Sequence, residues 1–477
     1  MDTQTRTGTA WTLGGSLDAA SAVKPERRAR SLSGLPPKPR PGRHWAIRIL
    51  TSPWTWLSAV LFPLYALVLW LVWRQLSADK VLPEGTIPGL DWQTVQQCAR
   101  YAAPTALVWS LGFILFDRLR PMKPLLWLLA FGWGSCMSIW LSLNINSWAA
   151  EMLNVSASAG DPAAQARPAV FVAPFVEEAS KATILFLLAI LIRYRIVSVL
   201  QSVGLAGLSA IGFAFTENIV YYARAMVYGS VTIGAGDVEE AVKQLVFLRG
   251  VITSYGHPMF TMFTGIGLLV GLRTRSKLVR VLAPLTGFCL AALGHMAFNG
   301  MATVGQQSPT WLVIQFGIIL FLMLSFLVRH QFKELKRIRS RLTDYVQIGW
   351  LPARDVHNFG TARARSRLIL VALTRGWRTL RDTVAIIRAA TELAYLRDAM
   401  VRGLIDVAGH EREKELLAEL KGLRATALHE TQGLKIRINW ARLAFWKHLR
   451  GGARQPQLAP ARVIHQPAQQ NWRPPGA

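Results

Sequence analysis

Long apolar segments separated by short polar connections dominate the chain between residues 54 and 328. Eight such segments are recognised, the second being the shortest: 54–73, 102–116, 124–145, 169–192, 197–223, 244–272, 278–301 and 310–328. A helix of about 20 apolar residues crosses a hydrocarbon core about 30 Å thick. The pattern therefore predicts an all-α fold, a polytopic membrane helix bundle with about eight transmembrane helices.

The two ends of the chain differ from this central region, residues 49–329. Residues 1–48 are polar and rich in Ser, Pro and Arg, which predicts a disordered, basic cytosolic tail. Residues 330–450 combine many charges with helical periodicity and are expected to form a basic cytosolic helical region, most simply a solvated or membrane-apposed helical hairpin. Residues 451–477, rich in Pro and Gln, predict a second disordered tail.

The distribution of charged residues predicts how the chain is oriented in the membrane. The 54 Lys and Arg outnumber the 27 Asp and Glu, for a formal net charge of +27. Besides the tails, three alternate connections are basic, near 118–123, 193–195 and 273–280, and the remaining ones are mixed, acidic or uncharged. Because Lys and Arg collect on the cytoplasmic side, both termini are expected there. The basic tails also predict contact with an anionic lipid surface, and no nucleic-acid-binding motif accompanies them.

The segment 169–192 reads AVFVAPFVEEASKATILFLLAILI and contains three charged residues, Glu177, Glu178 and Lys181. Each ionisable side chain at such a depth costs about 2.5 to 3.5 kcal/mol even on the lenient insertion scale, which implies a compensating role. The spacings of three and four residues let Lys181 reach either carboxylate on a helix. The simplest alternative is a buried ion pair that joins helices.

Later segments add Glu217, His257 and His295. Counting 1.5 Å per residue from the outer surface places Glu177, Glu217 and His295 about 9 to 12 Å deep, and His257 about 18 to 20 Å deep. With Asn218 and Asn299, these groups can hold and deprotonate a water molecule and stabilise an oxyanion. Each also has a simpler interpretation: the His and Asn side chains as interhelical hydrogen bonders, Tyr221 and Tyr222 as interfacial aromatics, and Arg249 as a charge partner or a snorkelling side chain.

Other hydrolytic motifs are missing or misplaced. The His-Glu dipeptides at His410 and His429 lack the second His of HExxH. The GAGD sequence at 234–237 lies in a polar connection, and Ser135 has no GxSxG context. Cys98, Cys136 and Cys289 show no CxxC spacing, so neither a disulfide framework nor a cysteine zinc site is expected. The first fifty residues show no cleavable signal sequence.

Four motifs occur in order on consecutive segments. They are EExxK at Glu177–Lys181, FxxxEN at Phe213–Asn218, His257, and His295 followed by Asn299. Over about residues 100–330 the chain resembles the PrsW-type intramembrane proteases of the CAAX protease and bacteriocin-processing superfamily. The resemblance implies hydrolysis of peptide bonds in membrane-associated protein substrates at a glutamate-centred site, typified by cleavage of anti-sigma factors, in the plasma (inner) membrane of a bacterium. Prenyl-protein relatives usually carry His where Glu217 stands, so CAAX substrates are not inferred.

These residues receive hypothetical roles. Glu177 is the general base on water, Glu178 is structural or shares a proton, and Lys181 sets their charge. Glu217 and His257 orient groups or shuttle protons, and His295 and Asn299 polarise the scissile carbonyl, with Phe213 and Asn218 in support. The two adjacent glutamates point about 100° apart, so only one faces a cavity squarely. Glu177, His257 and His295 could ligate zinc, although a water activated without metal is the first choice.

Two other functions remain open at this point. A proton-coupled membrane carrier would use the Glu and His side chains as a relay and needs a polar path through the whole bilayer. A non-catalytic membrane scaffold would use the same pocket to bind partner helices. The inner halves of the motif-bearing segments have almost no ionisable residues, which favours a closed cavity and a protease.

Overall fold

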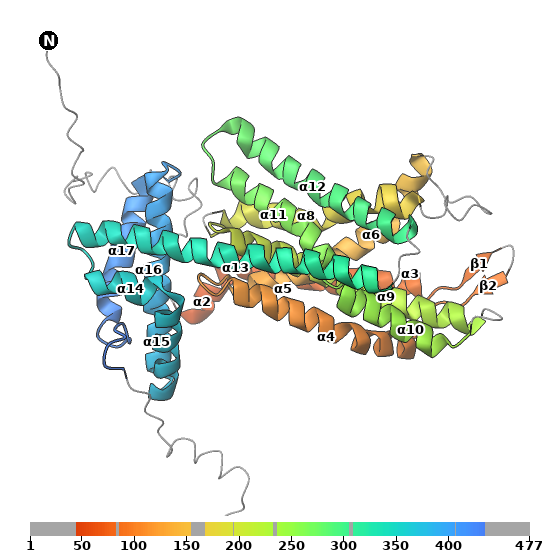
Figure 1. The fold of residues 1–477 in the computed structure, drawn as a ribbon, viewed down its shortest axis with the longest axis horizontal. Helices are drawn as coiled ribbons and strands as arrows, with labels where there is room; N and C mark the ends of the chain where they lie inside the picture. The colour runs from red at the N-terminus through yellow and green to blue at the C-terminus, as the bar shows by residue number, and fades with distance from the viewer. Residues whose placement is uncertain are drawn as a thin grey trace, which may run out of the picture.

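The computed structural model describes residues 44–82, 85–153, 167–193, 195–231, 236–304, 309–405 and 407–434. A bundle of long helices forms most of the molecule, and a smaller group of helices packs across one end of it (Figure 1). The two predicted disordered tails lie outside the described residues, except for residues 44–48.

The bundle consists of helices and one short hairpin. Its elements, in chain order, are α2 (Trp45–Leu50), α3 (Pro53–Leu76), β1 (Lys80–Leu82), β2 (Gly85–Ile87), α4 (Trp92–Phe116), α5 (Pro124–Gly132), η1 (Trp133–Ser138), α6 (Ile139–Met152), η2 (Pro168–Val172), α8 (Ala173–Ile192), α9 (Val199–Val231), α10 (Val238–Phe247), η3 (Leu248–Ile252), α11 (Gly256–Leu272), α12 (Lys277–Val304) and α13 (Pro309–Gln347). The η segments are short π-helices, and β1 pairs antiparallel with β2.

The all-α polytopic fold is confirmed, but the number of fully apolar spans differs from the expected eight. Six helical segments in the described part of the chain are long and apolar enough to cross a membrane: Trp54–Leu76, Trp92–Phe116, Pro124–Ala149, Val199–Ser230, Lys277–Met301 and Val313–Gln347. The other two expected spans contain α8, with its three charged residues, and α11, with only 17 residues. Both helices are largely buried, so protein surrounds their polar groups.

The predicted segment 244–272 is not one continuous helix. It begins in α10 and η3, breaks at Thr253–Tyr255, and starts again as α11 at Gly256. Pro258 explains where the new helix begins, because proline is tolerated in the first turn of a helix and not in its interior. His257 therefore lies at the start of a helix, and a depth counted along one continuous helix does not apply to it.

Helix α9 is the central element of the bundle. Of the residues in its most apolar stretch, 83% are buried, which is the largest share among the six spans. Two glycines allow α9 to approach η1 and the end of α5. A Cβ atom at Gly134 would lie 1.8 Å from the carbonyl oxygen of Ser209, and a Cβ atom at Gly212 would lie 2.1 Å from the carbonyl oxygen of Phe131. The Ser209 hydroxyl donates to the carbonyl oxygen of Lys181 at 3.1 Å, which fixes α9 against α8.

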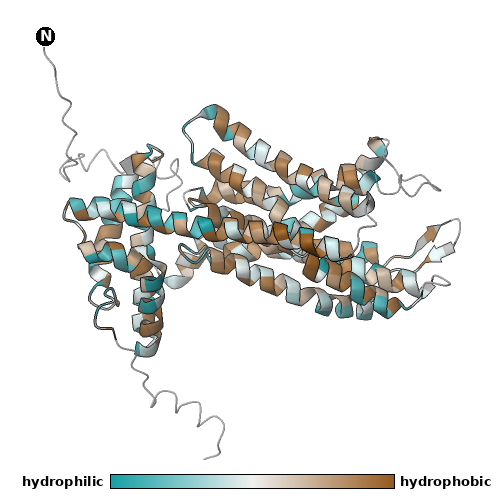
Figure 2. Ribbon diagram, in the orientation of Figure 1, coloured by the Kyte–Doolittle hydropathy of each residue, from teal (hydrophilic) through white to brown (hydrophobic). Residues whose placement is uncertain are grey.

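Helix α13 leaves the bundle as a single 39-residue helix and enters a second core. It packs there with α14 (Ala353–Gly360), α15 (Ala362–Arg375), α16 (Trp377–Val401) and α17 (Val407–Leu423). Buried apolar side chains in this core include Ile338, Leu342, Phe359, Leu368, Leu393 and Leu416. The C-terminal region, α14–α17 with the end of α13, is therefore a packed helical unit and not the expected hairpin. Its helices contain more hydrophilic residues than those of the bundle (Figure 2).

Candidate active site

The three charged residues of α8 are buried together. Glu177 is 7% exposed, and Glu178 and Lys181 are fully buried. Lys181 Nζ lies 3.4 Å from Glu177 Oε2 and 3.0 Å from Glu178 Oε1, and it sits 3.9 Å from the centre of the Phe213 ring. One cation thus compensates two buried carboxylates, as the spacing in the sequence indicates.

The two adjacent glutamates have different surroundings. Glu178 accepts a hydrogen bond from the Thr261 hydroxyl at 2.7 Å and lies 3.2 Å from His295 Nδ1, in addition to its contact with Lys181. Glu177 lines a cavity and has an ion pair with Lys181 at 3.4 Å. The structure therefore turns Glu177 toward the cavity and Glu178 into the packed interior, as a separation of about 100° requires.

A second charged cluster forms around Glu217 on α9. Arg249 Nη2 lies 2.5 Å from Glu217 Oε2, and Arg249 Nε donates to Asn218 Oδ1 at 2.8 Å. The guanidinium group also lies 3.9 Å from the centre of the Tyr221 ring. Of the two interpretations of Arg249, the charge partner is thus the one that the structure shows, and Tyr221 belongs to the same cluster.

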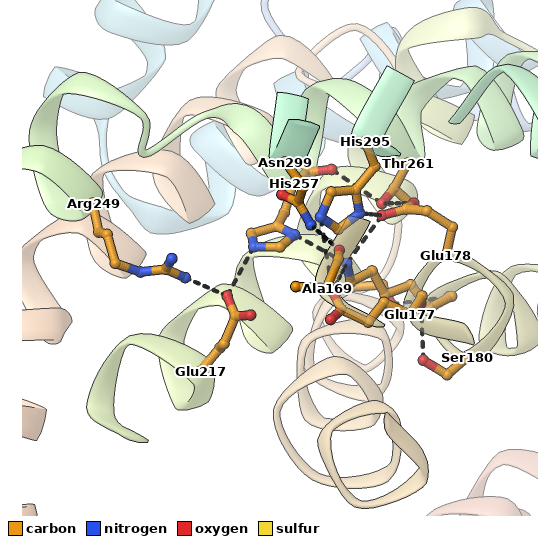
Figure 3. A network of polar contacts seen from close by, with 12 residues as sticks. Ala169, Glu177, Glu178, Ser180, Glu217, Arg249, His257, Thr261, His295 and Asn299 are labelled. Carbon is orange, nitrogen blue, oxygen red and sulfur yellow. Dashed lines mark hydrogen bonds and ion pairs between the residues drawn. The ribbon is translucent and has the colours of Figure 1, made fainter. Parts of the chain in front are cut away.

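His257 joins the two clusters (Figure 3). Its Nδ1 lies 3.0 Å from Lys181 Nζ, and its Nε2 lies 2.9 Å from Glu217 Oε2. An ammonium group can only donate, so Nδ1 acts as the acceptor and Nε2 carries the proton that Glu217 accepts. This assignment makes His257 a neutral imidazole between an ammonium and a carboxylate.

His295 and Asn299 come from α12. The His295 ring stacks on Phe260 with ring centres 5.0 Å apart, and its Nε2 lies 4.0 Å from Glu177 Oε2. Asn299 Nδ2 donates to the carbonyl oxygen of Ala169 at 2.8 Å, which connects α12 to the beginning of the segment that contains α8. Since an amide group has two N–H donors, one remains for another acceptor.

A cavity of about 80 Å³ lies among these side chains. This volume accommodates a few water molecules, and the lining supplies the polar partners that ordered water requires. Polar and charged side chains that line it are Glu177, Glu217, Asn218, Arg249, His257, His295 and Asn299. The residues singled out in the sequence therefore form one network, with Glu178 and Lys181 behind the cavity wall and Phe213 beneath the lysine.

The sequence interpretation did not identify three contacts that hold the network. Thr261 bonds Glu178, Trp133 Nε1 donates to the carbonyl oxygen of Ser180 at 3.0 Å, and Ser209 bonds the backbone of Lys181. Thr261 had a detectable signal, because it follows His257 by four residues and shares its helix face. Trp133 and Ser209 had none, since each is an ordinary residue of an apolar segment until its partner is known.

Comparison with known proteins agrees with these motifs. A family model described as PrsW family intramembrane metalloprotease matches residues 122–328. The likeness to the PrsW family covers these residues, which are less than half of the 477-residue chain. This region, the PrsW domain, is therefore a membrane protease domain, and the resemblance seen in the sequence is confirmed. The match begins at Met122, so α3 and α4 lie before it and the C-terminal unit after it. No curated protein and no solved structure matches the chain.

The family description raises the question of a metal. Glu177, His257 and His295 in the PrsW domain each offer one ligand atom, and these atoms lie within 4.8 Å of one another. Two imidazoles and one carboxylate are a known ligand set for catalytic zinc. Each histidine also has a carboxylate at one ring nitrogen, Glu178 for His295 and Glu217 for His257, as metal-binding histidines usually do. The donor set thus fits a divalent cation, which would compete with Lys181 for Nδ1 of His257.

Proposed function

We propose that the PrsW domain is an endopeptidase that cleaves membrane-associated proteins with a water molecule activated by Glu177. The observation that carries this proposal is the position of Glu177, whose carboxylate lines the cavity between Lys181 and His295. A general base must be within reach of the proton that it abstracts, and Glu177 meets this condition for water in the cavity. Lys181 favours the charged carboxylate form that can accept that proton.

The proposed reaction begins when Glu177 takes a proton from water and the oxygen forms a bond with the scissile carbonyl carbon. Breakage of the C–N bond then releases the new amine, which takes a proton from Glu177. The second N–H of Asn299 stabilises the negative charge on the carbonyl oxygen, and the His295 ring can do so when both of its nitrogens carry a proton, because Nδ1 already faces Glu178. Glu217 and Arg249 hold His257 in one orientation, so that this imidazole can relay a proton at the cavity wall.

Glu177, His257 and His295 would hold the divalent cation if the domain uses one. A metal bound there would act as a Lewis acid and lower the pKa of water. Glu178 and Glu217 would then orient the histidine rings, since these carboxylates lie against their other nitrogens.

The substrate class follows from the location of the site. The cavity lies between helices of the bundle, and its volume of about 80 Å³ is too small for a folded protein segment. A substrate must therefore present an extended stretch of backbone, and the helices around the cavity must separate to admit it. Membrane-bound regulators such as anti-sigma factors, whose cleavage releases a signalling protein, are the proposed substrates.

The distribution of ionisable residues argues against a proton-coupled carrier. Residues 182–192 of α8, 199–216 of α9 and 258–272 of α11 contain no ionisable side chain. A proton path across the bilayer would need polar groups along these stretches. The ionisable side chains of the cavity, Glu177, Glu217 and His257, instead lie toward the other ends of these helices and form no relay toward the C-terminal unit.

We propose that the end of the bundle next to the C-terminal unit faces the cytoplasm of a bacterial cell. The three basic connections lie at this end, and the basic tails would contact anionic lipids of the plasma (inner) membrane. Single-cysteine variants test the orientation in intact spheroplasts. A membrane-impermeant maleimide should label Glu239→Cys on α10 and should not label Arg375→Cys on α15; the opposite labelling would reverse the proposal.

Cleavage itself can be tested in the host. Membrane-protein N-termini should be compared in cells that produce the wild type, Glu177→Gln, Glu217→Gln or the control Glu239→Gln. Glu239 is an exposed glutamate whose partner is an exposed lysine. We expect new N-termini near membrane segments with the wild type and the control, and their loss with the other two variants. Equal fragments in all four strains would refute the proposed peptidase.

A further inference from the structure

A second cavity, of about 530 Å³, lies between the PrsW domain and the C-terminal unit. One wall consists of residues at the end of α11, at the beginning of α12, and in the connections that follow α4, α8 and α11. The other wall consists of α16, the segment after it, and α17. The volume is within the range of small-molecule sites.

Positive charge dominates this cavity. Six arginines line it, against a single carboxylate, Glu392: Arg120, Arg193, Arg273, Arg275, Arg280 and Arg412. Arg412 is compensated within the C-terminal unit, because its guanidinium group lies 2.9 Å from Glu392 and 3.1 Å from Glu415. The carboxylate of the lining is therefore already paired with Arg412.

Arg273 is one of the less exposed of these cations. Its side chain is 12% exposed, and its Nη2 makes no hydrogen bond to any described residue. The nearest carboxylate oxygen, on Asp398, is 3.7 Å away, and Asp398 also pairs with Arg341 and Arg402. Burial, opposed by Asp398 and reinforced by Arg402, lowers the pKa of Arg273 to about 10. Arg273 shares Asp398 with two other arginines, and its Nη2 lacks a hydrogen bond to the described residues, so this position favours a further anion.

Arg275 lies in the same connection, two residues after Arg273, and is exposed. Its guanidinium group packs against Gly403, where a Cβ atom would lie 3.1 Å from Nη1. Gly403 has φ of +63°, so the close approach rests on a residue that readily adopts this conformation. No carboxylate in the described part of the chain is within ion-pair distance of Arg193 or Arg275.

We infer that this cavity binds a phosphate-bearing ligand, which Arg273 and Arg275 hold between α11 and the α16–α17 segment. Guanidinium groups match the geometry of phosphate oxygens and remain charged when partly buried. Leu272, Leu396 and Ile405 in the lining provide apolar contacts for the organic part of the ligand. The same chemistry occurs in an anionic phospholipid headgroup and in a soluble nucleotide, and the ligand would connect the PrsW domain to the C-terminal unit.

Binding experiments on the full-length protein separate the two sources. In the soluble arm, adenosine triphosphate and inorganic pyrophosphate are titrated by calorimetry into protein in nanodiscs of phosphatidylcholine. In the lipid arm, native mass spectrometry measures retention of phosphatidylglycerol from mixed nanodiscs. Arg273→Gln and Arg275→Gln should weaken binding at least about tenfold in the arm that shows it, because each removes charge-assisted hydrogen bonds.

The control is Arg375→Gln, an exposed arginine at the end of α15 outside the cavity lining, which should bind like the wild type. If Arg273→Gln does not fold, the binding measured for Arg275→Gln tests the inference, because an exposed side chain can be replaced without disturbing the core. Binding by neither probe to the wild type would overturn the inference. So would equal binding by Arg275→Gln and Arg375→Gln.

Discussion

The ammonium nitrogen of Lys181 lies 3.0 Å from Nδ1 of His257, and this contact joins α8 to α11. The same ammonium compensates both glutamates of the EExxK motif. Lys181 is thus the centre of the network, although its full burial keeps it away from substrate. Its role in the proposed reaction is to hold charge and geometry for Glu177 and His257.

Replacement of Lys181 by Met should strongly destabilise the protein. The variant leaves two buried carboxylates without their cation, and breaking a buried pair from one side costs about 3–5 kcal/mol. Denaturant or thermal unfolding of the detergent-solubilised protein measures the loss. Lys243→Met is the matched control, because Lys243 pairs with Glu239 on the exposed surface of α10 and should matter little. Equal stability of the two variants would contradict the network.

Replacing each of the two adjacent glutamates should reduce the stability of the protein by a different amount. Glu178→Gln weakens contacts with Lys181, Thr261 and His295, and hydrogen bonds to charged groups are worth about 1.5–3 kcal/mol each. Glu177→Gln changes a side chain that borders the cavity and should reduce stability less. Unfolding curves of both variants, measured under one condition, provide the comparison. A larger loss for Glu177→Gln would mean that the two positions have been assigned the wrong way round.

Metal binding gives a third prediction. The purified protein, loaded with zinc and then desalted, should retain about one ion per chain, because two imidazoles and a carboxylate match a zinc site. His295→Ala and Glu177→Gln should each lose it, and His429→Ala, outside the PrsW domain, should not. Metal analysis by plasma mass spectrometry detects the ion directly. Retention by the two site variants at the wild-type level would exclude this ligand set.

The C-terminal unit should respond to acid through Glu392. Burial raises the pKa of this carboxyl, but Arg120 and Arg412 outweigh burial and lower the pKa below its ordinary value. A carboxyl with a lowered folded-state pKa stabilises the fold above its unfolded pKa of about 4.3, and this contribution is lost as pH falls through the folded value. Unfolding measured from pH 6 downward should show less acid sensitivity in Glu392→Gln than in the wild type. Parallel curves would contradict the assigned pairing.

Much of the site could be predicted because its residues are charged or polar and lie in segments that are otherwise apolar. Glu177, Glu178 and Lys181 interrupt an apolar segment, and such interruptions are costly enough to indicate a purpose. The helical spacing then gave the Lys181 contacts correctly. The sequence could not assign separate roles to the two glutamates, since that depends on which neighbours pack on each face of α8.

The break before His257 could not be predicted from hydropathy. Apolar residues lie on both sides of this short break, so the pattern indicates one helix where the structure has two. Pro258 was the available signal, and its position in the first turn of α11 shows how it should have been used. The packed C-terminal unit was missed for a similar reason, because periodicity predicts helices and does not show which of them share a core.

The most direct test of the central claim uses purified components. A membrane protein whose cleavage is found in the host is reconstituted into proteoliposomes with the wild-type protein, Glu177→Gln or Glu239→Gln, and the rate of fragment formation is measured. Loss of a general base lowers the rate about 10²- to 10⁴-fold. We predict that loss for Glu177→Gln and a wild-type rate for Glu239→Gln. Cleavage by Glu177→Gln at the wild-type rate would show that the cavity between α8, α9, α11 and α12 is not where the peptide bond is hydrolysed.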